Sequence, residues 1–285
     1  MRKTRRAVTA GAILFVTWGF ALADSLGGLD VSNGPTFGVS QTYQNVVSAV
    51  GQTLQGYGKV DSINSIPVSR LCSDCELTYA FDGYTVTSIS PTAIKFSGGS
   101  YKYYLGFGSA NDFTTLNAGG SAGDRAEATN GTLFLSLKGH AIDAAGDTLV
   151  GTGADIGAAI PTGFSSGLAD VDTSAGGLAN AFFDANQIAA LFGGGNADFQ
   201  LGASYTGLQP AYPSECSTGS GPACLRGSAD FTGTAKDITA TAVPEPATLA
   251  LLALSLAGLA ASRRPKKKQE LLGHSESRRP RSTRT

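Results

Sequence analysis

Residues 77–89 read LTYAFDGYTVTSI, in which two runs of β-branched and aromatic residues flank the dipeptide Asp82-Gly83. Such residues favour pleated strands, and Asp-Gly between two strands is typical of a tight hairpin turn. The sequence therefore predicts a hairpin in which 77–81 pairs with 85–89. The next residues repeat the pattern, because strand-forming residues at 93–96 and 101–105 flank Gly98-Gly99 and predict a second hairpin.

The same alternation of short strands and turn residues continues on both sides of these hairpins. Strands are predicted at 36–43, 58–63, 76–81, 85–90, 93–96, 101–107, 131–138, 198–205 and 229–241. Apolar residues near helical spacing predict a helix or an irregular segment at 178–192, docked on the sheet. Two stretches rich in Gly, Ala and Ser, 117–128 and 151–177, are predicted loops. The fold class is therefore mainly β, an antiparallel β-sandwich or jelly roll.

Charge is distributed unevenly along the chain, although its net value is only −1. Residues 24–243 carry 19 acidic and 8 basic side chains, which gives 8 − 19 = −11. Such an acidic region repels nucleic acid, so no nucleic-acid partner is expected. Gly accounts for 38 of the 285 residues. This abundance suits a folded domain with many turns.

The first 23 residues have the pattern of a signal peptide. A basic start is followed by the apolar run AGAILFVTWGF at 10–20. Ala21 and Ala23 then form an A-x-A cleavage site for signal peptidase, so the mature chain is expected to begin near Asp24. The alternative is an uncleaved membrane anchor, but the apolar run is short for a span.

A second apolar segment lies near the other end of the sequence. Pro244, Glu245 and Pro246 precede the stretch ATLALLALSLAGLAA at 247–261, which a basic cluster at 263–268 follows. Fifteen helical residues would extend about 22 Å, which is short for a membrane span. The basic cluster is expected to stay on the cytoplasmic side. An ordinary tail anchor is the alternative reading.

These three ordered features, at 243–268, resemble the PEP-CTERM sorting domain. The resemblance implies an exported protein that an exosortase-type enzyme recognises at Pro244, Glu245 and Pro246. It further implies a single transmembrane helix that anchors the chain transiently in the inner membrane. Delivery would then be to the cell surface or extracellular matrix of a Gram-negative-type bacterium, where exopolysaccharide is a further partner. The segment 269–285, predicted to be a disordered basic tail, is longer than tails of this family.

The remaining residues, 24–242, form the predicted ectodomain, which contains all four cysteines. Export places them in an oxidising compartment, where disulfides are the default. Short separations favour the pairs Cys72–Cys75 and Cys216–Cys224. A redox site at Cys72-x-x-Cys75 would need a βαβ context, and a Cys₄ zinc site would need a second short knuckle.

Catalytic patterns are weak in this ectodomain. Ser121 and Ser165 each lie in a G-x-S-x-G match, but both matches lie in Gly/Ser-rich stretches where chance matches are common. The one histidine of residues 24–243, His140, is expected to be a surface or satisfied side chain. We therefore predict no catalytic site, no cofactor and no enzyme activity.

Two groups of side chains suggest weaker binding hypotheses. Carboxylates that could bind Ca²⁺ occur at Asp143, Asp147, Asp155, Asp170 and Asp172, although without EF-hand spacing. Tyr101, Tyr103, Tyr104 and Phe107 could stack on sugars, but core packing explains them better.

The leading functional hypothesis is a non-enzymatic structural or adhesive component of envelope, floc or biofilm. One alternative is a secreted hydrolase of extracellular polymer whose paired carboxylates are distant in sequence. The other is a Ca²⁺-stabilised carbohydrate-binding or adhesion module.

Overall fold

The computed structural model describes residues 24–31, 34–158, 162–190, 195–218 and 221–236. Contacts divide the chain into two units, Met1–Ile238 and Thr239–Thr285. The predicted signal peptide at 1–23 and the predicted helix at 247–261 lie outside the described residues. Among the residues that are described, no helix has the length and apolar character needed to cross a membrane.

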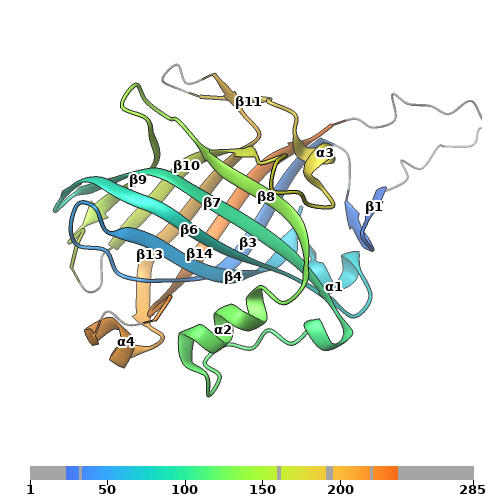
Figure 1. Cartoon of the computed structure of the whole chain (residues 1–285), viewed down its shortest axis with the longest axis horizontal. Helices are drawn as coiled ribbons and strands as arrows, with labels where there is room; N and C mark the ends of the chain where they lie inside the picture. The colour runs from blue at the N-terminus through green and yellow to red at the C-terminus, as the bar shows by residue number, and fades with distance from the viewer. Residues whose placement is uncertain (1–23, 32–33, 159–161, 191–194, 219–220, 237–285) are drawn as a thin grey trace, which may run out of the picture. The chain divides into compact units, whose positions relative to one another are not determined.

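Antiparallel strands make up most of the described domain, which we call the closed-sheet domain (Figure 1). The main sheet contains β3 (Gly34–Gln44), β4 (Thr53–Ile63), β5 (Ile66–Pro67), β6 (Cys75–Ser90), β7 (Ala93–Phe107), β8 (Thr132–His140), β9 (Asp147–Ala154), β10 (Thr162–Val171), β13 (Phe199–Pro210) and β14 (Leu225–Ala235). Smaller elements are β1 (Asp24–Leu26), β2 (Leu29–Val31), β11 (Ile188–Ala189), β12 (Asn196–Ala197), α1 (Val68–Leu71), η1 (Gly108–Ala110), α2 (Gly120–Ala128), α3 (Asn180–Phe183) and α4 (Pro213–Thr218).

The main sheet closes on itself. Its order is β13-β14-β3-β4-β6-β7-β8-β10, and β10 pairs again with β13 from Phe164↔Ser204 to Ala169↔Phe199. β9 pairs with β10 on one side and with β7 on the other, so it lies between them along part of the closed sheet. The prediction of a mainly β, antiparallel fold is confirmed. The expected sandwich of two stacked sheets is not what forms, because the strands lie in one barrel-like sheet.

The two predicted hairpins are wrong, because each pair of predicted strands is one continuous strand. β6 and β7 together form a single long hairpin whose register runs from Cys75↔Phe107 to Ser90↔Ala93. Gly83, Gly98 and Gly99 lie inside these strands with φ of 75°, 72° and 91°. Glycine adopts this left-handed backbone without a Cβ penalty, so the strands bend there and continue instead of turning back.

Two loop predictions are corrected. The supposed loop at 117–128 contains α2, and the supposed loop at 151–177 contains β10 and the end of β9. The segment at 178–192, predicted to be helical or irregular, is mostly irregular within the described part, where its one helix is the four-residue α3. Asp198 accepts the N–H groups of Ala185 and Asn186 just after α3, and this hydrogen bonding replaces helical bonds there.

Aromatic rings fill the enclosed face of the sheet. Tyr103, with 4 % of its surface exposed, and the partly buried Tyr101 belong to this core, as predicted. The same prediction is wrong for Phe107, which is exposed at the end of β7. Several rings lie over glycines of a neighbouring strand: Tyr79 over Gly58, Phe81 over Gly56, Phe231 over Gly38 and Phe199 over Gly233. A Cβ at any of these glycines would overlap the ring, so part of the high Gly content serves core packing instead of turns.

The outer face of β3, β4 and β6 carries a second, smaller core. Tyr43, Tyr57 and Ala80 are buried there together with Phe113 and Ala128, and Tyr104 packs against them. Figure 1 shows α2 lying across this side of the sheet, near α4. α2 carries Asp124 and α4 carries Glu215, two carboxylates that bond to other parts of the domain.

Candidate functional site

Asp124 of α2 is the centre of a buried polar cluster between the sheet and α4. The carboxylate of this fully buried residue accepts hydrogen bonds from the Tyr57 hydroxyl at 3.2 Å and from the Tyr212 hydroxyl. It also accepts the backbone N–H groups of Leu116 and Asn117 at 3.1 and 3.2 Å. Four donors therefore converge on one carboxylate, which uses its accepting capacity within the chain.

Burial sets the protonation state of the two tyrosines in this cluster. Burial first, and the neighbouring Asp124 carboxylate second, raise the pKa of Tyr57 far above its ordinary value. Burial and the hydrogen bond to Asp124 likewise raise the pKa of Tyr212. Both hydroxyls therefore remain protonated donors across the physiological range, which is the arrangement of a structural support for α2 and α4.

Ser121, the serine of the first G-x-S-x-G match, forms the second link between α2 and α4. Its backbone N–H donates to Glu215 Oε1 at 3.0 Å, and its hydroxyl donates to Glu215 Oε2. The Ala223 N–H in turn donates to Ser121 Oγ at 3.3 Å. Since Ser121 is fully buried and bonded to a carboxylate instead of a histidine, it lacks the exposed position and partner of a serine nucleophile.

The second match and the histidine lie elsewhere. Ser165 is a buried residue within strand β10, so it does not lie on the strand-to-helix turn of a nucleophile elbow. His140, at the end of β8, places Nδ1 2.9 and 3.0 Å from the two carboxylate oxygens of Asp170. Its Nε2 is buried and has no hydrogen-bond partner among the residues that the structure describes.

The candidate Ca²⁺ ligands do not come together. Lys95 Nζ lies 2.7 Å from Asp143 and 3.0 Å from Asp147, so an ammonium group occupies the space between these carboxylates. The hydrogen bond from Lys95 lowers the pKa of Asp143.

The other candidates lie apart from this pair. Asp170 binds His140, Asp172 accepts the N–H and hydroxyl of Ser174, and Asp155 lies in the turn that follows β9. Across the described ranges, no three Asp, Glu, His or Cys side chains gather in a way that could hold a metal ion.

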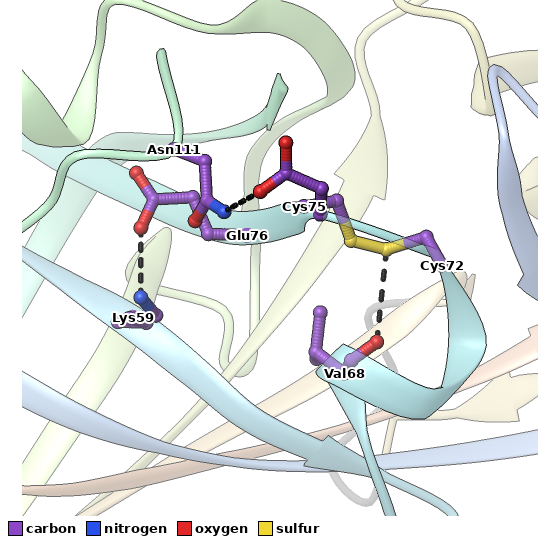
Figure 2. Close-up of a disulfide and its surroundings, with 7 residues drawn as sticks. Lys59, Val68, Cys72, Cys75, Glu76 and Asn111 are labelled. Atoms are coloured by element: carbon purple, nitrogen blue, oxygen red, sulfur yellow. Dashed lines mark hydrogen bonds and ion pairs between the residues drawn. A yellow bond between two sulfur atoms is a disulfide. The ribbon is translucent and has the colours of Figure 1, made fainter. Parts of the chain in front are cut away.

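The four cysteines form two local disulfides, and these are the pairs that their spacing favoured. Cys72 follows α1 and Cys75 begins β6, with 5.8 Å between their Cα atoms (Figure 2). Next to this bridge, the buried Glu76 forms an ion pair with Lys59 at 2.7 Å and accepts the N–H of Phe113. The Cys216–Cys224 bridge connects α4 to the residue before β14, and so helps to hold Glu215 against Ser121.

Asp124, Glu215 and Glu76 were not predicted as site residues. The hydrogen bonds of Asp124 reach partners 67 and 88 positions away, and that of Glu215 reaches a partner 94 positions away. No short motif spans such separations. The one available signal was that some acidic residues lie in stretches rich in Gly, Ala and Ser. A carboxylate buried in such a stretch needs hydrogen bonds from nearby backbone N–H groups.

Comparison with known proteins gives one match, which lies near the C-terminal end of the sequence. Neither a curated protein nor a solved structure matches the sequence. Residues 242–264 match the family model of the PEP-CTERM protein-sorting motif, and this range includes Pro244, Glu245 and Pro246, which lie outside the described residues. The chain therefore carries a PEP-CTERM protein-sorting motif, which supports an exported protein with a membrane-anchored C-terminal segment that an exosortase processes.

Proposed function

We propose that the chain is the precursor of a non-enzymatic envelope or matrix protein, delivered to the cell surface through an exosortase pathway. The match at 242–264 is the observation that carries this proposal. In this reading the closed-sheet domain is the delivered part. Residues 1–23 direct export, and the residues from Pro244 onward hold the precursor at the membrane until processing.

The contacts of three carboxylates, two of them fully buried, support a structural role for the domain. Asp124, Glu215 and Glu76 each accept hydrogen bonds from donors of the same chain, so they reinforce the fold instead of facing a substrate. The two disulfides agree with residence in an oxidising compartment. We further propose exopolysaccharide as the partner of the delivered protein.

Removing the sorting segment tests this proposal. We expect deletion of residues 244–261 to abolish retention at the cell surface while leaving export intact, because the apolar stretch and the recognition residues are both lost. Deletion of residues 269–285 is the matched control and leaves surface retention intact. Mass spectrometry of protein from the native envelope reads out both termini. Unchanged surface delivery of the 244–261 deletion would contradict the proposal.

A further inference from the structure

Both ends of the closed-sheet domain lie at the same end of the sheet. Asp24 of β1 pairs with Val31 of β2, only three positions before Gly34, where β3 begins. Gly34 pairs with Ala235, the last residue of β14. We call this end of the sheet the exit end. Figure 1 shows β1, α1 and α3 grouped at that end.

Four of the exposed large apolar side chains lie at the exit end. They are Phe37, Ile66, Phe107 and Leu178, with 54, 44, 41 and 49 % of their surface exposed. We call these four residues the exit-end apolar set. They come from four separate parts of the chain that the fold brings to one end of the sheet: β3, β5, the end of β7 and the segment before α3.

Backbone contacts fix the position of each member. The Phe37 N–H donates to Asn64 Oδ1 at 2.8 Å, next to the turn that leads to Ile66. Phe107 pairs with Cys75 where β7 ends, and the Leu178 N–H donates to Leu133 O at the start of β8.

The β1–β2 turn connects the last two members of the set. A Cβ at Gly28 would lie 3.0 Å from the Phe107 ring, and one at Gly27 would touch Leu178. Of the other four exposed large apolar residues of the described part, Val50 and Phe164 lie at the opposite end, in the β3–β4 turn and near the start of β10. Val39 is in β3, and Leu116 lies between η1 and α2.

The connection to the sorting segment is short. Lys236 is the last described residue, and only residues 237–246 separate it from the apolar stretch at 247–261. Ten residues span at most about 36 Å when fully extended. While that stretch is in the membrane, the exit end is the part of the domain that is tethered closest to lipid.

We propose that the exit-end apolar set contacts the lipid surface while the precursor is anchored. This inference rests on the proposed function, since anchoring supplies the tether. A short tether gives an effective concentration of about millimolar, so even a weak apolar contact is populated. Near this end, acidic side chains outnumber basic ones. The basic residues are Arg70 and Lys236, and the acidic residues include Asp30, Asp74, Asp112 and Asp184. The contact is therefore apolar, and it does not require anionic lipid.

The tryptophan content of the chain allows a direct test. Trp18 is the one tryptophan in the sequence, so a Trp18→Phe chain offers a background without this fluorophore. Into the full-length chain we would introduce Phe37→Trp or Phe107→Trp at the exit end. Phe164→Trp, an exposed aromatic exchange at the opposite end, is the matched control. Each chain is reconstituted in phosphatidylcholine vesicles with or without brominated acyl chains, which quench tryptophan at the lipid boundary.

We expect brominated lipid to quench the tryptophan at positions 37 and 107 and to leave the one at position 164 unchanged. Added phosphatidylglycerol should not increase the quenching. Vesicle flotation distinguishes a failure of the lipid contact from a failure of membrane anchoring. Chains that float with vesicles but show no quenching at 37 and 107 overturn the lipid contact alone. Chains that do not float overturn the anchoring in the proposed function, and the contact with it. Far-UV circular dichroism verifies that each variant is folded.

Discussion

At the scale of single residues, the buried tyrosines determine how the domain responds to alkali. The Tyr79 hydroxyl lies 3.0 Å from Gln41 O and 3.2 Å from Ser40 Oγ inside the sheet. Burial raises its pKa from 10.0 to about 12. Burial also raises the pKa of Tyr84 and Tyr103. The folded state therefore keeps protons that the unfolded chain loses.

We predict that the contribution of the buried tyrosines to stability is constant below pH 10 and falls between pH 10 and 12. In that window the folded domain binds more protons than the unfolded chain, so the free energy of unfolding decreases as pH rises. For Tyr79 alone a two-unit shift corresponds to about 3 kcal/mol. Urea unfolding across this range, with tyrosinate absorbance as a second probe, measures the effect. Tyr79→Phe should flatten the pH dependence, whereas an equally steep decline in that variant would contradict the assignment.

Sequence reasoning succeeded for the two disulfides, whose cysteines are close in the sequence. Cys72–Cys75 and Cys216–Cys224 span 3 and 8 positions, so spacing alone favoured these pairs. The Asp124 and Glu215 contacts could not be predicted in this way, because each depends on how α2 and α4 meet after the sheet has formed.

At the scale of elements, the long β6–β7 hairpin shows why turn signals misled the prediction. Asp82-Gly83 and Gly98-Gly99 have the composition of hairpin turns, yet they lie across from one another in the paired strands. The true turn is at Pro91-Thr92, between Ser90 and Ala93. Positive φ at a glycine is shared by turns and by bends in curved strands, so composition alone does not distinguish them.

Gly99 tests the role of these bends. We predict that Gly99→Ala destabilises the domain by about 3 kcal/mol, because a Cβ would combine a left-handed backbone with overpacking. That Cβ would lie 2.3 Å from the Tyr84 ring. Gly51→Ala is the matched control, since its φ of 86° is similar to the 91° of Gly99 but nothing lies within 4 Å of a Cβ there. Urea unfolding compares the two, and equal losses would show that ring packing contributes nothing.

At the scale of the whole domain, closure depends on strands that are far apart in the sequence. β14 pairs with β3 along eleven positions and also pairs with β13. The alternating pattern predicted an antiparallel sheet, but the same alternation suits a sandwich and a closed sheet. The choice between them depends on the pairings β3–β14 and β10–β13, which no local pattern encodes.

We predict that residues 24–236 fold on their own and that residues 24–224 do not. The shorter chain keeps both disulfides but lacks β14, so β3 and β13 would each be left with an unpaired edge. Thermal unfolding followed by circular dichroism should show a cooperative transition for the longer chain only. A cooperative transition in the shorter chain would mean that β14 is dispensable for the fold.

The pairing of the first long strand with the last imposes an order in time on biogenesis. When the polypeptide emerges N-terminus first, β3 can acquire β4 early but must wait for β14 on its other edge. β14 is followed by only eleven residues before the apolar stretch that begins at Ala247. The pairing of β14 with β3 can therefore form only after almost all residues that precede the sorting motif have emerged.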